Sequence, residues 1–171
     1  MEKILKINKF LMNLSTVKFI IVMTFATYFF STLITPLLAY TVNEEIWLEA
    51  SQSQVLFHSL SLIGKIVLVI TIIPIVETFI FQWGMIKILR LVEIFKEKNV
   101  VIISISAFVF ALSHNYSIIH IVHTFIMGWI FAYAYMIYEN KINKSFFQSP
   151  ILVVTAIHSL RNTISLFIAS I

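Results

Sequence analysis

Eight ionisable side chains stand out within strongly apolar segments of this 171-residue sequence. They are His58, Lys65, Glu77, His114, His120, His123, His158 and Arg161. Because such groups are costly to bury in apolar helices, each of them is a candidate functional residue. The chain contains neither Cys nor Asp, which excludes thiol nucleophiles, Cys-ligated metal centres and catalytic groups completed by an aspartate.

Glu77 is the single carboxylate among them, and it follows Pro74 in the run PIVETFIFQW. A carboxylate in an apolar helix is expected either to be paired or to take part in catalysis, where it suits the role of a general base. The structural alternative is an ion pair with Lys65 or Arg161. The residue type alone leaves both possibilities open.

Two further pairs have helical spacing. Phe110 and His114 in the run FALSH are four residues apart and share a helix face. His158 and Asn162 in the run HSLRN have the same spacing, and they can either donate two hydrogen bonds to one oxygen or hold two helices together. His114 alone also has the alternative role of a structural residue at a helix end.

Three of these polar groups are expected at a similar depth. Counted at 1.5 Å per residue from the basic end of each apolar segment, Glu77 lies about 20 Å in, His114 about 21 Å and Asn162 about 18 Å. His158 is shallower by a turn, at about 12 Å. Polar groups that reach one level from separate helices can form a single convergent site.

The other histidines and Lys65 give weaker signals. His120 and His123 are three residues apart and could share a metal ion, but no Cys, Asp or HExxH motif is present to complete such a site. Helix–helix hydrogen bonding is their alternative, and we expect no metal. Lys65 can pair with Glu77 or extend along its helix toward water. His58 lies near the outer end of its segment and is interpreted as structural.

The composition indicates that membrane-spanning helices position these residues. The sequence is 60% apolar and 12% charged, with a mean hydropathy of +0.97, whereas about a quarter of a soluble domain is charged. The apolar segments are residues 17–41, 55–73, 75–91, 100–114, 118–138 and 150–171. We expect an all-α, polytopic transmembrane helical bundle that forms one domain over residues 1–171, with its first segment retained rather than cleaved as a signal peptide.

The basic residues predict the topology. Ten of the twelve Lys and Arg side chains precede the first, fourth and last apolar segments, which places the N-terminus and these connections in the cytoplasm. Their spread along the chain favours a lipid bilayer, and not a nucleic acid, as the partner. Residues 55–92 must then cross the membrane only once, with a kink at Pro74 and a second half that is tilted or lies at the interface. The chain then crosses about five times, which places the C-terminus outside the cell.

Three short motifs carry a resemblance to a known family. The run ETFIFQ begins at Glu77, FALSH ends at His114 and HSLRN ends at Asn162. In this order they resemble the EExxxR, FxxxH and HxxxN motifs of the CPBP (Abi) family, which comprises CAAX prenyl endopeptidases, bacteriocin-processing proteases and bacteriocin self-immunity proteins. The resemblance covers residues 72–162, more than half of the chain.

The resemblance implies a role for each matching residue. Glu77 and His114 would activate a water molecule, while His158 and Asn162 would stabilise the negatively charged oxygen of the intermediate. This chemistry uses neither a metal nor another cofactor. It agrees with the chemistry of the residues themselves, because a general base and aimed hydrogen-bond donors suffice for attack of water on an amide.

The first motif departs from the family pattern at two positions. Thr78 replaces the second Glu and Gln82 replaces the Arg. Because these positions are four residues apart, the matched replacement predicts a neutral hydrogen-bonded pair that leaves Glu77 intact. Arg161 is a candidate for the missing cation, and Phe110 of the second motif is a further supporting residue.

Two classes of function remain. The first is an intramembrane endopeptidase that cleaves a peptide or protein near the membrane; the alternative is a catalytically weak family member that acts as a bacteriocin immunity or membrane interaction protein. A small transporter ranks third, since the chain is short for inverted repeats. The excess of Lys over Arg, together with abundant Ile, favours a bacterial plasma membrane, and hence a peptide precursor as the substrate.

Overall fold

The computed structural model describes residues 2–41, 60–114, 117–141 and 149–169, and every regular element in these ranges is helical. The elements are α1 (Glu2–Asn13), α2 (Thr16–Thr41), α5 (Leu62–Gly64), η1 (Lys65–Ile72), α6 (Ile73–Glu77), η2 (Thr78–Gly84), α7 (Met85–Leu91), α8 (Asn99–Leu112), α9 (Ile118–Glu139) and α10 (Pro150–Ala169). The two η elements are π-helical. The expected all-α class is confirmed.

Four helical segments are long and apolar enough to cross a membrane. They are Thr16–Leu38, Leu62–Leu91, Ile118–Glu139 and Pro150–Ile168. The apolar helix α8 is shorter, with 14 residues, which corresponds to about 21 Å of helical rise. Together these helices form a multi-pass membrane bundle, as the composition predicts.

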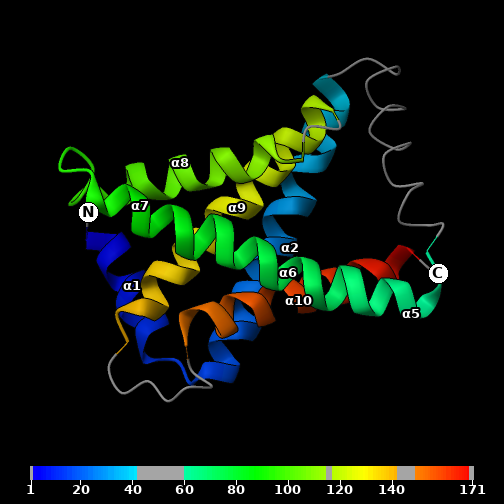
Figure 1. The fold of residues 1–171 in the computed structure, drawn as a ribbon, viewed down its shortest axis with the longest axis horizontal. Helices are drawn as coiled ribbons and strands as arrows, with labels where there is room; N and C mark the ends of the chain where they lie inside the picture. The colour runs from blue at the N-terminus through cyan, green and yellow to red at the C-terminus, as the bar shows by residue number, and fades with distance from the viewer. Residues whose placement is uncertain (1, 42–59, 115–116, 142–148, 170–171) are drawn as a thin grey trace.

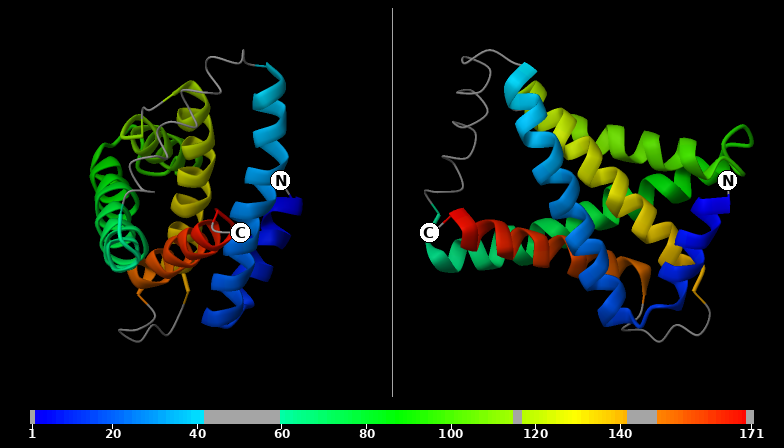
Figure 2. Two further views of the ribbon diagram at one scale, coloured as in Figure 1. Left: turned by 90° about the vertical axis from the view of Figure 1, so that its right-hand side faces the viewer. Right: turned by 180° about the vertical axis from the view of Figure 1, so that it is seen from behind.

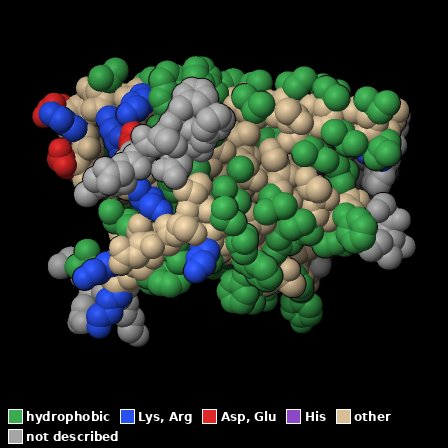
Figure 3. All heavy atoms as spheres, turned by 90° about the horizontal axis from the view of Figure 1, so that it is seen from below, with side chains coloured by type: hydrophobic (Ala, Val, Ile, Leu, Met, Phe, Trp, Pro, Cys, Tyr) green, Lys and Arg blue, Asp and Glu red, His purple; other side chains and the backbone are tan. Residues whose placement is uncertain are grey.

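The chain runs back and forth between two ends of the molecule. The N-terminus and the connection from α7 to α8 lie at one end, and the C-terminus, the end of α8 and the start of α9 lie at the other (Figures 1 and 2). Lys and Arg side chains gather mainly at the N-terminal end (Figure 3). Five successive passes result, made by α2, the run from α5 to α7, α8, α9 and α10.

The segment around Pro74 differs from the expected kink with a separate second half. Residues 62–91 form one unbroken helical run (Figure 1), with π-helical turns before and after the short helix α6. In an α-helix the proline ring would clash with the carbonyl four residues earlier. The wider π-helical turn relieves this clash by shifting the bonding register: the N–H of Ile73 donates to the carbonyl of Leu68, five residues earlier.

The core lies around α9, which contacts α2, α8 and α10. Gly128 permits α8 to approach α9 closely, because a Cβ at this position would lie 2.7 Å from Cδ1 of Phe110 and 3.1 Å from Cα of Ala107. Large side chains that are almost completely buried fill the rest, among them Phe19, Ile86, Ile102, Phe131, Tyr138 and Val154. Apolar side chains also cover much of the outer surface (Figure 3), as a lipid-facing bundle requires.

Polar contacts tie the helices together at the N-terminal end. Lys87 Nζ lies 2.7 Å from one carboxylate oxygen of Glu139, and Arg90 Nη1 lies 2.5 Å from the other. Lys141 donates a hydrogen bond to the carbonyl of Leu14. These contacts join α7 to α9, and the end of α9 to the link between α1 and α2.

Candidate active site

Glu77, His114 and His158 meet from three different helical segments. Oε1 of Glu77 lies 3.2 Å from Nε2 of His114, and Oε2 of Glu77 lies 3.6 Å from Nε2 of His158. The side chains are 16%, 27% and 7% exposed, respectively. One carboxylate therefore faces two imidazoles at a partly shielded position, and the alternative ion pair of Glu77 with Lys65 or Arg161 is not found among the described residues.

The hydrogen-bond partners of His114 fix where its protons lie. Nδ1 is 3.0 Å from the carbonyl oxygen of Phe110 and 3.1 Å from Oγ of Ser113. The hydroxyl of Ser113 donates to the same carbonyl, and since a carbonyl can only accept, Nδ1 carries a proton. Nε2 faces a carboxylate oxygen of Glu77, so this contact is a hydrogen bond only when a second proton lies between the two groups. The pair is therefore built to share one proton, either as imidazolium and carboxylate or as imidazole and carboxylic acid.

Aromatic rings orient His158. Its imidazole stacks on Phe131, with ring centroids 4.6 Å apart and an interplanar angle of 30°, and it meets the edge of Phe110 at 6.3 Å. Its Nδ1 is buried and has no hydrogen-bond partner among the described residues. Ring packing thus orients Nε2 toward Glu77, where it can also address a substrate oxygen. Phe110 also meets His114 edge-on at 4.8 Å, so the phenylalanine of the second motif contacts both histidines.

Asn162 is held by an unusual feature of the neighbouring helix. Its Nδ2 donates to the carbonyl of Val69 at 3.0 Å. In the π-helical register that carbonyl would accept from the residue five positions later, which is Pro74 and has no N–H. The proline thus leaves one carbonyl free inside the bundle, and Asn162 of α10 binds it. This contact uses one of the two amide hydrogens of Asn162.

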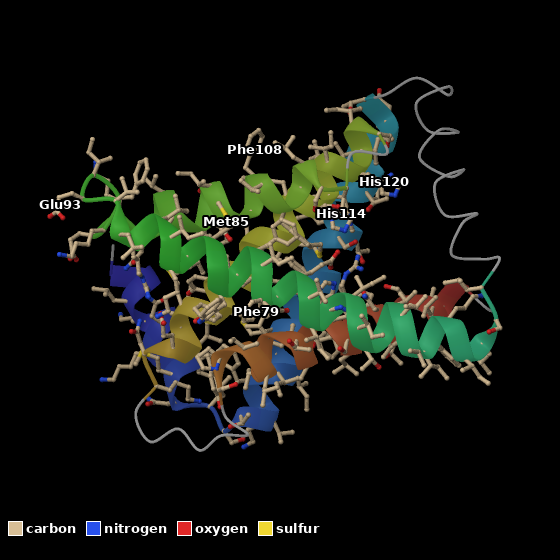
Figure 4. The ribbon with its side chains drawn as sticks, viewed as in Figure 1. Phe79, Met85, Glu93, Phe108, His114 and His120 are labelled. Atoms are coloured by element: carbon tan, nitrogen blue, oxygen red, sulfur yellow. The ribbon has the colours of Figure 1, made fainter. Side chains whose placement is uncertain are left out.

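A cavity of about 610 Å³ connects these residues. Seven of the eight ionisable side chains singled out in the sequence line it; the eighth, His58, lies outside the described residues. The polar part of the lining comprises Lys65, Glu77, Ser113, His114, His120, His123, Thr124, His158, Arg161, Asn162 and Ser165. Figure 4 shows His114 and His120 at the same end of the molecule, on either side of the turn between α8 and α9.

His120 and His123 make contacts that hold the wall of this cavity. Nε2 of His123 lies 2.7 Å from Oγ of Ser31 and so joins α9 to α2. Nδ1 of His120 lies 3.2 Å from Oγ of Ser117, which also caps the start of α9. Helix–helix hydrogen bonding, the alternative to metal binding, is thus found for His123. Among the described residues no group of three or more His, Cys, Asp or Glu side chains could hold a metal ion.

The hydrogen bond predicted between Thr78 and Gln82 is absent. Both side chains are completely buried, yet Thr78 Oγ1 and both polar atoms of the Gln82 amide lack a partner among the described residues. Both residues belong to the π-helical element η2, in which residues four positions apart no longer stand directly above one another. The i, i+4 argument assumed an α-helix, and for this reason it failed.

Sequence reasoning also missed the contributions of Val69 and Phe131. Neither side chain is polar, and Val69 acts through its backbone carbonyl. The available signal was Pro74 five residues after Val69, but it becomes informative only once the helix is known to be π-helical there.

Residues 59–164 match a protein family model described as "Type II CAAX prenyl endopeptidase Rce1-like". The match covers more than half of the chain and includes Glu77, His114, His158 and Asn162. Comparisons with curated proteins and with solved structures found no match.

Proposed function

The chain belongs to the Rce1-like family of type II CAAX prenyl endopeptidases, and from this premise we propose that it hydrolyses a peptide or protein at the membrane with Glu77 and His114 as the water-activating pair. The observation that carries the proposal is the contact of one carboxylate with two histidines from separate helices at the wall of a cavity. Family membership supplies the reaction class, since this is a family of CAAX-type intramembrane proteases.

The reaction we propose begins with a water bound beside Glu77 and His114. Attack of its oxygen on the peptide carbonyl carbon forms the new C–O bond, and one proton passes to the Glu77–His114 pair. Collapse of the tetrahedral intermediate breaks the C–N bond, and the pair returns the proton to the departing amine. The products are a carboxylic acid and an amine, which ionise to a carboxylate and an ammonium group, and the step consumes only water.

His158 and Asn162 are the proposed donors to the oxyanion. Nε2 of His158 is positioned by stacking on Phe131, and the second amide hydrogen of Asn162 is not used by Val69. Donors fixed before the reaction stabilise the developing charge without reorganisation, at about 2.7–4 kcal/mol each.

Incubation of the purified full-length protein with synthetic leader-type peptides tests this proposal. Cleavage is expected, and in H₂¹⁸O the new carboxylate should gain one ¹⁸O atom, as mass spectrometry would show. A chelator should leave the rate unchanged, because the mechanism invokes no metal. Absence of cleavage across a broad peptide set, under conditions where the protein stays folded, would contradict the assignment as an endopeptidase.

The second candidate is a catalytically weak family member that acts as an immunity or interaction protein. Thr78 and Gln82, which are buried and lack a partner in the described part of the chain, favour it, because they replace the charged pair of the family's first motif. In a cell that produces a bacteriocin or is sensitive to one, this function would persist in a Glu77→Gln variant, whereas a function that requires proteolysis would be lost.

A further inference from the structure

The cavity carries more positive than negative charge. Lys65 and Arg161 line it together with one carboxylate, that of Glu77. Glu77 is already in contact with His114 and His158. In the described part of the chain, neither cation therefore has a carboxylate to pair with.

The backbone of Arg161 is anchored, and no carboxylate of the described residues neutralises its charge. Its backbone carbonyl accepts a hydrogen bond from the hydroxyl of Tyr28 at 2.5 Å, which ties this turn of α10 to α2. Its Nη1 lies 3.5 Å from Oδ1 of Asn162, and its Nε is buried without a partner among the described residues. A guanidinium in such surroundings gains most from a planar anion that accepts two parallel hydrogen bonds.

We propose that Arg161, assisted by Lys65, forms a subsite that binds a carboxylate of the substrate. Both cations share one cavity with Glu77 and His114, so the bound carboxylate would lie within a few residues of the bond that is cleaved. The volume of about 610 Å³ is in the range of pockets that enclose small ligands. An acidic side chain and a free C-terminus present the same group to Arg161.

This inference rests on the proposed function for the nature of the substrate, and it is tested by binding as well as by cleavage. The probes are four peptides of one sequence that carry Glu or Gln at one position and a C-terminal carboxylate or amide. Their affinity for the full-length Glu77→Gln protein is measured by fluorescence anisotropy, so that cleavage does not consume them. The same measurement is made after adding Arg161→Gln, Arg161→Lys or, as a control on an exposed loop lysine, Lys96→Gln.

We expect at least one carboxylate-bearing peptide to bind about tenfold more tightly than the fully neutral peptide, which corresponds to about 1.4 kcal/mol. Arg161→Gln should abolish this preference, Arg161→Lys should keep part of it, and Lys96→Gln should leave it unchanged. The peptide with a single carboxylate that binds more tightly identifies the side chain or the C-terminus as the recognised group.

Equal affinity for the charged and neutral peptides would overturn the inference, as would a preference that survives Arg161→Gln. If Arg161→Gln fails to fold, the peptide comparison with Arg161 intact and the Arg161→Lys variant still decide. Cleavage by the chain with native Glu77 is scored separately on the same four peptides. A binding preference for carboxylate-bearing peptides without cleavage would support the subsite and contradict the endopeptidase function. Cleavage without such a preference would support the endopeptidase function and contradict the subsite.

Discussion

At the level of single residues, Gln82 makes the clearest prediction about stability. Its amide is completely buried with both polar atoms unpartnered among the described residues. An unsatisfied buried polar group costs about 1–3 kcal/mol, so the apolar variant Gln82→Met, of similar length, should raise the free energy of unfolding by an amount of that order. Thermal or denaturant unfolding of the purified protein in detergent measures the change.

Ser106→Ala is the matched control for Gln82→Met. Ser106 is also completely buried, but its hydroxyl donates to the carbonyl of Phe81 at 2.6 Å. Its removal should destabilise the protein by about 0.5–1.5 kcal/mol. A loss of stability in both variants would show that the Gln82 amide is satisfied after all.

At the level of helices, Gly128 sets the distance between α8 and α9. In Gly128→Ala the new methyl group would meet Phe110 at 2.7 Å and the backbone of Ala107 at 3.1 Å. We expect a loss of about 1–3 kcal/mol from overpacking, together with slower cleavage, because Phe110 contacts both His114 and His158.

Gly64→Ala provides the comparison for that variant. Its added Cβ would meet only side-chain atoms, the nearest being Oγ of Ser61 at 3.3 Å, so stability and activity should stay close to those of the parent. Melting temperature and cleavage rate are measured on both variants. Unchanged values for Gly128→Ala would mean that the α8–α9 contact does not position the site.

Pro74 and Asn162 should act as one unit across two helices. Pro74→Ala restores an N–H that can bond to the carbonyl of Val69 and so compete with the amide of Asn162 for this acceptor. We expect slower cleavage without a loss of helix stability, since alanine is the better helix former. In a double-mutant cycle with Asn162→Ala the effects on rate should be clearly less than additive, and full additivity would show that the two residues act independently.

The sequence predicted the convergence of the site residues better than the local geometry of their helices. Counting residues from the basic ends placed Glu77, His114 and Asn162 at one level, and the structure brings them to one cavity. Counting residues gives the height of a side chain along its helix. To predict which face of the helix the side chain lies on, a helical period must be assumed. The count therefore could not anticipate the π-helical turns around Pro74 or the failure of Thr78 to meet Gln82.

At the level of the whole molecule, the distribution of charge predicts the orientation in the membrane. Basic side chains gather mainly at the end that holds the N-terminus (Figure 3), and such an end faces the cytoplasm. A topology reporter fused after Tyr116 should therefore read as external and one fused after Lys144 as cytoplasmic. Reversed readings would show that the orientation is the opposite one. Equal readings for the two fusions would show that α9 does not cross the membrane.

The all-α class and the multi-pass bundle follow from composition and hydropathy, because runs of about 20 apolar residues typically form membrane-spanning α-helices. That Lys65, His120, His123 and Arg161 share the cavity with Glu77 could not be read from the sequence. It depends on how each helix is rotated about its axis, and the weak amphipathicity of lipid-facing helices gives little information on this rotation.

The cleavage rate of Glu77→Gln tests the central proposal most directly. The amide keeps the shape of the side chain but cannot accept the proton of water, so the rate should fall about 10²-fold or more while the protein stays folded. Glu93→Gln, which alters an exposed carboxylate in the α7–α8 connection, should cleave the same peptide at the parent rate. Cleavage by Glu77→Gln at the parent rate would contradict the assignment of Glu77 as the base.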